Sequence, residues 1–202
     1  MACTVNFTNT SHFTGVLGAF NCQGGGWCPV SRKNKSVNEY SVAVTCLSSP
    51  KDVERSNGTN PVSVEGANIF AVYMYRQKKL KLLKLSENVE ITLQPFDYEL
   101  LTVTPVAVLS KKSVQFAPIG LVNMLNSGGA IESLVYDNNE EEESSVSIGV
   151  RGSGEMRVFA SEKPSSCTID GVSVDFSYED HMVTAQVPWP NSSRLSEINY
   201  VF

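Results

Sequence analysis

Two cysteines, three glycines and a tryptophan come together in the stretch NCQGGGWCP, residues 21–29. Structural zinc sites use two ligand pairs with two to four residues between the members. Five residues lie between Cys22 and Cys28, and no second pair follows. A phosphate-binding loop would need a helix directly after its glycines, whereas Trp27 leads into a proline and a polar stretch. A Cys22–Cys28 disulfide is sterically possible, but five cysteines and no export signal indicate free thiols.

The remaining interpretation of this stretch is a shaped loop. Glycines permit backbone angles that other residues avoid, and they let another surface approach closely. Trp27 offers a flat apolar face on which a sugar ring could stack, or it fills a core or an interface. Gln23 and Trp27 are therefore the candidate substrate-binding residues, and Trp189 is an alternative stacking platform that more readily packs at a strand end.

Three other clusters of polar or glycine residues are better explained without catalysis. The run Glu179-Asp180-His181 lies between two strand-like segments, so we expect a solvent-exposed turn that cannot straddle a sugar as a glycosidase pair does. The run Gly152-Ser153-Gly154 precedes a strand-like segment and predicts a hairpin turn. The acidic run 137–145 lacks the alternating ligands of a calcium loop and predicts a solvated hairpin tip. We expect no catalytic residue, no metal site and no cofactor in this chain.

Short β-rich segments separated by turn residues dominate the chain. Residues 89–93, VEITL, alternate cleanly between apolar and polar, and Asp170-Gly171 supplies the backbone angles of a tight hairpin. Pro105 predicts an edge position or a bend within 98–109, and residues 80–85 fit either helix or strand. Only residues 119–126, after Pro118 and before Ser127-Gly128-Gly129, look helical. The sequence thus predicts an all-β, antiparallel β-sandwich with at most a short helix near 119–126. The other strand-like segments are 68–76, 145–150, 156–160, 172–176, 182–187 and 198–202.

Charge and hydropathy exclude several classes of partner. The net charge of −5 gives no field that would attract nucleic acid or an anionic membrane. No stretch approaches the ~18 apolar residues of a membrane-spanning helix, and the opening residues do not predict a signal peptide. We therefore expect no nucleic-acid partner, no membrane partner, and a cytoplasmic location, with a plastid as the alternative.

Five long stretches resemble one family, the plant raffinose synthases, seed imbibition proteins and alkaline α-galactosidases of glycoside hydrolase family 36. They are FTGVLGAFNCQGGGWC at 13–28, PFDYELLTVTPVAVL at 95–109, VQFAPIGLVNMLNSGGAI at 114–131, VRGSGEMRVFASEKP at 150–164 and VPWPNSSRLSEINYVF at 187–202.

The resemblance implies a larger enzyme in which this chain is the carboxyl-terminal β-sandwich. Such an enzyme carries its two catalytic aspartates on a (β/α)8 barrel, so no residue here inherits a catalytic role. Its implied activity is galactosyl transfer from galactinol to sucrose, giving raffinose. An α-galactosidase fragment or an independent carbohydrate-binding module is the alternative. We expect residues 1–12 to be an irregular start in place of the end of the barrel, and residues 13–202 to form the sandwich with the barrel as partner.

Overall fold

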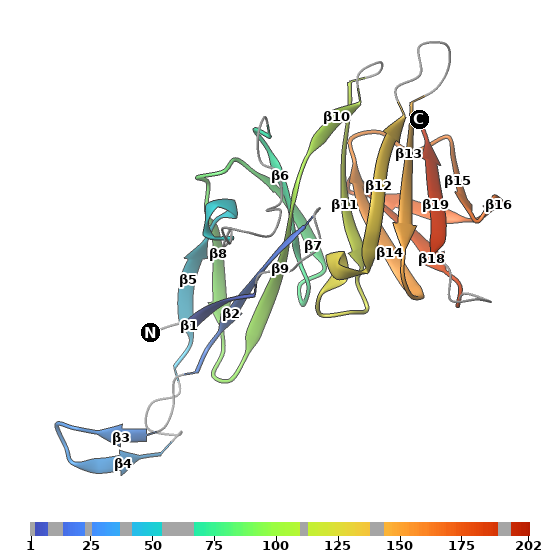
Figure 1. The fold of residues 1–202 in the computed structure, drawn as a ribbon. Coiled ribbons are helices and arrows are strands. Elements are labelled where there is room, and N and C mark those ends of the chain that lie inside the picture. The colour runs from blue at the N-terminus through green and yellow to red at the C-terminus, as the bar shows by residue number, and fades with distance from the viewer. Residues whose placement is uncertain are drawn as a thin grey trace.

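The computed structural model describes residues 3–7, 14–22, 26–36, 42–53, 67–109, 113–137, 144–189 and 195–202 (Figure 1). These ranges contain antiparallel strands and two short 3-10 turns, η1 (Pro50–Asp52) and η2 (Ser127–Ala130), and no α-helix. The expected all-β class is confirmed. The strands form two lobes that lie side by side in Figure 1.

The first lobe is built from a five-stranded sheet and a two-stranded sheet. The five-stranded order is β1-β2-β9-β6-β7, and β5 pairs with β8. Apolar side chains from β2, β6, β8 and β9 meet between the two sheets and form the core of this lobe. The strands are β1 (Cys3–Phe7), β2 (Gly15–Phe20), β5 (Val44–Ser48), β6 (Phe70–Met74), β7 (Lys79–Leu83), β8 (Val89–Leu93) and β9 (Tyr98–Pro105).

Two sequence expectations meet this lobe directly. Within the start that we expected to be irregular, residues 3–7 instead pair with β2 from Cys3 opposite Phe20 to Phe7 opposite Val16. The domain boundary at residue 13 stays a prediction. The ambiguous segment 80–85 contributes most of β7, which pairs with β6.

The second lobe is a sandwich of two five-stranded sheets with one apolar core between them. Their orders are β10-β11-β14-β18-β17 and β12-β13-β19-β15-β16. The ring of Phe116 lies near those of Tyr136, Tyr200 and Phe202 in the middle of this core. The strands are β10 (Ala107–Leu109), β11 (Val114–Leu121), β12 (Ile131–Asp137), β13 (Ser145–Val150), β14 (Gly154–Ala160), β15 (Ser166–Ile169), β16 (Val172–Ser173), β17 (Phe176–Glu179), β18 (Met182–Val187) and β19 (Ser196–Val201).

A third apolar cluster joins the two lobes. Ala71 and Tyr73 of β6 pack with Ile119 of β11 and Phe159 of β14. Strand β6 is therefore buried on both faces, since its alternate residues enter the first-lobe core. Pro105 is the last residue of β9, and the chain passes from there into β10 of the second lobe. Strand β9 lies between β2 and β6, so Pro105 does not mark an edge strand.

The helix expected at 119–126 does not form. Residues 119–121 complete β11, and the turn that follows leads into η2. The register of β11 against β14 shifts between Pro118 and Gly120. Such a bulge accommodates a proline and lets Ile119 face the lobe interface while Leu121 faces the sandwich core. The run of apolar residues reflects burial on both faces of a strand rather than a helical period.

Three turns test the interpretation of short glycine and acidic motifs. Asp170 and Gly171 have φ of 52° and 78° between β15 and β16, so the predicted hairpin is confirmed. Asp180 and His181 have φ of 49° and 61° and form an equally tight, exposed hairpin turn between β17 and β18. The hairpin predicted at 152–154 is wrong, because β13 and β14 belong to different sheets and this turn is a corner between them. In the acidic run, residues 138–143 lie outside the described residues.

Candidate functional site

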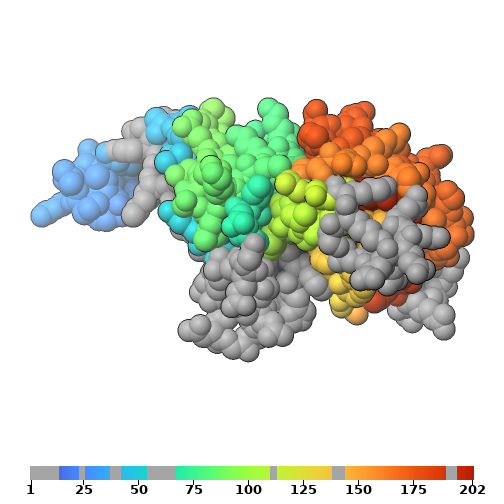
Figure 2. Space-filling model, turned by 90° about the horizontal axis from the view of Figure 1, so that it is seen from above, coloured from blue at the N-terminus to red at the C-terminus, as the bar shows by residue number. Residues whose placement is uncertain are grey.

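The stretch NCQGGGWCP divides between a buried anchor and a projecting hairpin. Strands β3 (Gly26–Cys28) and β4 (Lys33–Lys35) pair only with each other and extend from the first lobe as an arm (Figures 1 and 2). Trp27 lies opposite Asn34 on this arm and is 63% exposed. Trp27 therefore does not fill this chain's own core, and its interface and sugar-stacking interpretations stay predictions. Gln23 lies outside the described residues.

Asn21 anchors the arm to the first lobe. Its side chain is buried, and the Nδ2 group donates to the carbonyl oxygens of Val42 at 2.9 Å and Leu93 at 3.1 Å. Its backbone N–H donates to the backbone carbonyl oxygen of Asp97, and its own carbonyl accepts from the N–H of Phe96. One asparagine thus ties together both chain segments that lead into the arm and the β8–β9 turn beside them.

That β8–β9 turn exposes an aromatic ring in an unfavourable backbone conformation. The N–H of Asp97 donates to the carbonyl of Gln94, which closes a turn with Pro95 and Phe96 in the middle. Phe96 has φ of 61°, as the third residue of a type II turn requires, where glycine or asparagine is favoured. Its side chain is 63% exposed. The turn therefore presents the Phe96 ring on the surface of the first lobe beside the arm.

The arm is basic in a chain that is acidic overall. Residues 26–36 contain Arg32, Lys33 and Lys35 and no aspartate or glutamate. Cys28 lies directly opposite Lys33. Hydrogen bonds from Ser31 lower the pKa of the Cys28 thiol to about 7. We call the exposed side chains of Trp27, Val42 and Phe96, with the three cations, the arm surface.

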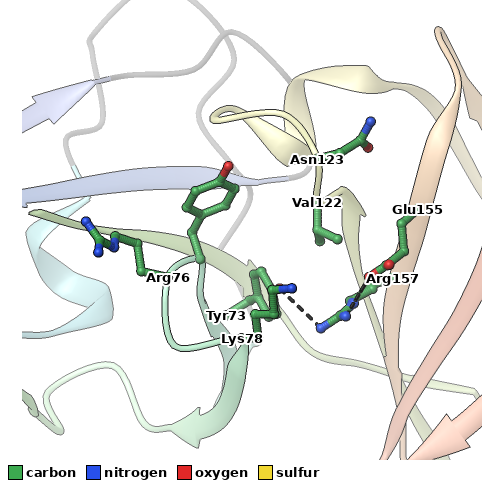
Figure 3. Close-up of a pocket in the computed structure, with 8 residues that line it drawn as sticks. Tyr73, Arg76, Lys78, Val122, Asn123, Glu155 and Arg157 are labelled. Atoms are coloured by element: carbon green, nitrogen blue, oxygen red, sulfur yellow. Dashed lines mark hydrogen bonds and ion pairs between the residues drawn. The ribbon is translucent and has the colours of Figure 1, made fainter.

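A pocket of about 440 Å³ lies where the β6–β7 turn meets β11 and β14 (Figure 3). The first lobe contributes two tyrosines and two cations, and the second lobe contributes a polar wall. We call it the lobe pocket, and its lining residues are Tyr73, Tyr75, Arg76, Lys78, Val122, Asn123, Glu155 and Arg157.

Arg157 organises the inner wall of the lobe pocket. Its Nε and Nη2 groups both bind Glu155 Oε1 at 2.5 Å, and its Nη1 donates to the Tyr73 hydroxyl oxygen at 3.2 Å. The guanidinium carbon lies 5.5 Å from the centre of the Tyr73 ring. Burial raises the pKa of Tyr73 despite the nearby Arg157 charge, so the phenol keeps its proton.

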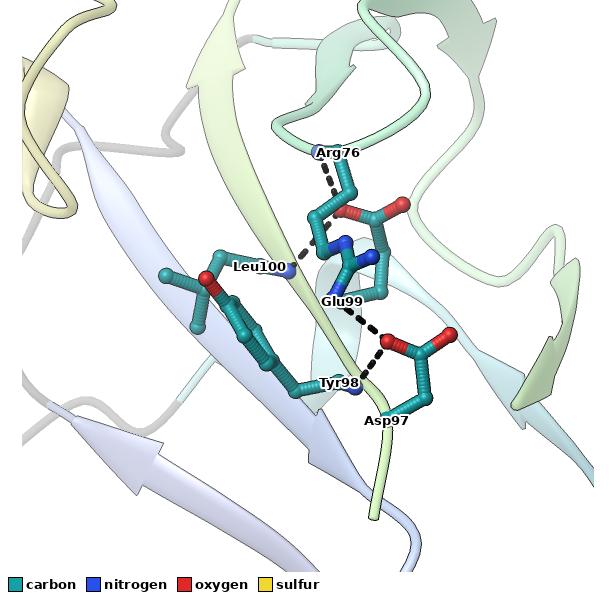
Figure 4. A network of polar contacts seen from close by, with 5 residues as sticks. All are labelled: Arg76, Asp97, Tyr98, Glu99 and Leu100. Atoms are coloured by element: carbon teal, nitrogen blue, oxygen red, sulfur yellow. Dashed lines mark hydrogen bonds and ion pairs between the residues drawn. The ribbon is translucent and has the colours of Figure 1, made fainter. Parts of the chain in front are cut away.

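A second polar network holds the outer wall (Figure 4). Glu99 is only 2% exposed, and one of its oxygens accepts from the backbone N–H groups of Arg76 at 2.8 Å and Leu100 at 3.0 Å. The Arg76 guanidinium binds Asp97 and lies over the ring of Tyr98. These contacts fix the β6–β7 turn, and with it the first-lobe side of the pocket.

The other sequence candidates do not join either site. Trp189, in the second lobe, is 80% exposed, so it does not pack at a strand end as the sequence had suggested. The Tyr178 hydroxyl lies 3.2 Å from His181 Nδ1, and its neighbours Glu179 and Asp180 lie in the exposed hairpin. The described residues contain no group of three or more histidine, cysteine or acidic side chains placed to hold a metal ion. In the same part of the chain, no helix has the length and hydropathy to cross a membrane.

The functional residues that sequence reasoning missed are Asn21, Phe96 and Arg157. A signal for Phe96 existed, since Pro-Phe occupies a position where Pro-Gly is usual in a type II turn. Asn21 precedes the glycine run and could have been identified as an anchor. Arg157 has no local signal, because its link to Tyr73 spans 84 positions in the sequence.

Residues 3–187 match the family described as raffinose synthase or seed imbibition protein Sip1. The chain is 57% identical to the galactinol–sucrose galactosyltransferase of Pisum sativum over 194 residues, and 45% identical to that of Oryza sativa subsp. japonica over 197 residues. It is 34% identical to the stachyose synthase of Pisum sativum over 183 residues. These alignments cover 96%, 96% and 90% of this chain but 24%, 24% and 21% of those proteins. The chain therefore spans about a quarter of the length of these curated relatives.

Proposed function

Since the chain belongs to the raffinose synthase or seed imbibition protein Sip1 family, we propose that it is the non-catalytic, carboxyl-terminal β-sandwich region of a raffinose synthase-like galactosyltransferase. The complete enzyme would transfer a galactosyl group from galactinol to sucrose and form raffinose. The 57% identity to the galactosyltransferase of Pisum sativum across 96% of the chain carries this proposal.

The geometry of the lobe pocket supports a role without catalysis. Glycosyl transfer with retention uses two carboxyl groups about 5–5.5 Å apart on either side of the scissile bond. Among the described residues that line the pocket, Glu155 is the one carboxylate, and it forms an ion pair with Arg157. The chemistry is therefore assigned to the part of the enzyme that carries the barrel.

The arm surface is proposed to dock on that catalytic barrel. It combines an exposed tryptophan and phenylalanine with three cations, so it fits an acidic face with an apolar centre. Contacts made by the Phe96 ring in the complete enzyme would compensate for its unfavourable backbone conformation. The same arm would bring Trp27 to the barrel, either as an interface residue or as a distant sugar contact.

A reducing compartment, the cytoplasm or a plastid, is proposed for the enzyme. The described cysteines Cys22, Cys28, Cys46 and Cys167 are free thiols. Burial raises the pKa of the Cys167 thiol to about 11, which keeps it protonated and unreactive.

A chimera tests the proposed function. This chain replaces the matching region of the Pisum sativum enzyme, and both the chimera and the 202-residue chain alone are incubated with galactinol and sucrose. We expect raffinose from the chimera and none from the chain alone. Raffinose from the chain alone would contradict the non-catalytic role, and free galactose as the sole product of the chimera would mean that this region does not support transfer to sucrose.

Substitutions in the chimera test the docking step separately. Trp27→Ala and Phe96→Gly are expected to lower the chimera's melting temperature and its rate of raffinose formation. Trp189→Ala is the matched control, since Trp189 is even more exposed but belongs to the other lobe. If Trp27→Ala and Trp189→Ala behave alike in both measurements, the arm surface is not the docking surface.

A further inference from the structure

We propose that the lobe pocket is a second, non-catalytic binding site for one sugar unit of a neutral glycoside. Its volume of about 440 Å³ falls in the range of ~300–1,000 Å³ that is typical of small-molecule sites. The described side chains that line it come from both lobes of this chain.

The inner wall presents hydrogen-bonding groups with capacity to spare. The Tyr73 hydroxyl accepts from Arg157, and none of the described residues accepts its own proton. Tyr73 is only 1% exposed and forms the floor of the pocket, and its phenol stays protonated because burial raises its pKa. Asn123, which is exposed at the opposite edge, adds an amide that both donates and accepts. Sugar hydroxyls also donate and accept, and they match such a mixed wall.

The outer wall adds a cation and a ring face. Within the described part of the chain, Lys78 makes no ion pair, and Figure 3 shows its side chain extending toward Arg157 across the pocket. Tyr75 is half-buried and lines the same wall. A partly covered tyrosine ring offers the apolar face that the C–H side of a sugar requires.

The charge balance favours a neutral ligand over an anion. Arg157 is held by Glu155, and Arg76 is held by Asp97. An anion in the pocket would face the Glu155 carboxylate, and Lys78 is the one cation among the described lining residues that has no counter-charge. A neutral glycoside meets no such repulsion and uses all of these groups as donors or acceptors.

The backbone conformation of Lys78 supplies a control for the binding test. Lys78 ends the β6–β7 turn with φ of 53°, a region that favours glycine and asparagine. Ser113 has nearly the same φ of 55° in the β10–β11 turn but does not line the pocket. The two positions therefore form a matched pair in which the backbone strain is shared and the ligand contact is not.

The test measures binding and stability together. The 15N-labelled 202-residue chain is titrated with raffinose, sucrose and galactinol while its amide chemical shifts are followed. The choice of these probes rests on the proposed function, so glucose and maltose are included as sugars outside it. We expect saturable shifts at residues 75–78, 122–124 and 155–157 with at least one of the five sugars.

Lys78→Gly is expected to keep or raise the melting temperature and to weaken binding about fivefold, the equivalent of one hydrogen bond. Ser113→Gly is expected to raise the melting temperature similarly and to leave binding unchanged. Equal binding by the two variants would overturn the proposal, as would saturation by sulfate in place of sugars or the absence of sugar-induced shifts at these residues. Binding of glucose or maltose without the galactosides would retain the pocket as a sugar site while counting against the proposed substrates, so the two ideas fail separately.

Discussion

Replacing the buried anchor of the arm should destabilise the first lobe. Asn21→Ala removes two side-chain hydrogen bonds to the carbonyls of Val42 and Leu93. Each bond contributes about 0.5–1.5 kcal/mol net, and the Leu93 carbonyl is left buried without this donor, so we expect a loss of about 2–3 kcal/mol. For a chain of this size that corresponds to about 5–10 °C in melting temperature.

Thermal and urea unfolding followed by circular dichroism measure this loss. Asn34→Ala is the matched control, because it removes the same amide from an exposed position on the arm and should cost less than ~0.5 kcal/mol. Asn21→Asp should be worse than alanine, since it turns a carboxylate oxygen toward two carbonyls. Equal stability of the Asn21→Ala and Asn34→Ala variants would refute the idea that Asn21 anchors the arm.

Two further predictions concern one glycine and one thiol. Gly120→Ala should cost several kcal/mol of stability. Gly120 has φ of 106°, and a Cβ there would lie 2.0 Å from the Ser127 carbonyl oxygen. Gly171→Ala is the control, because its Cβ meets open space and should cost only about 1–2 kcal/mol of backbone strain. Urea unfolding distinguishes them, and equal losses would contradict the assigned contact. Cys28 should be alkylated by iodoacetamide with a rate that rises with pH around a midpoint near 7, and Ser31→Ala should move that midpoint upward, as mass spectrometry of the modified peptide can show. An unchanged midpoint would mean that Ser31 does not stabilise the thiolate.

Sequence patterns predicted the elements whose two faces have different surroundings. Residues 89–93 alternate between buried and exposed, as VEITL indicates, since β8 faces a core on one side only. The hairpin at Asp170-Gly171 follows from local backbone preferences alone. An alternating strand and a tight hairpin depend on residues that are close together in the chain, so both can be predicted from a single sequence.

Elements buried on both faces lose that signal. In β6 the residues that alternate in direction enter two different apolar clusters, so all five are buried and no period remains. In β11 the bulge after Pro118 and burial on both sides imitate a short helix. Whether Gly152 lies in a hairpin or in a corner depends on which distant strands β13 and β14 join, and the local sequence does not encode that choice.

The arm surface and the lobe pocket both contain residues with positive φ that are neither glycine, asparagine nor aspartate. Asparagine and aspartate tolerate this conformation, which accounts for Asp170 and Asp180 in their hairpins. Arg32, Lys78 and Phe96 gain no such local hydrogen bond, and each costs the isolated chain about 1 kcal/mol relative to glycine. Arg32 lies in the turn of the arm, Phe96 at its base and Lys78 in the pocket, where a partner or ligand can repay the strain through their side chains. Glycine at all three positions should therefore stabilise the 202-residue chain and weaken both barrel docking and glycoside binding, and a gain in all three properties would refute this argument.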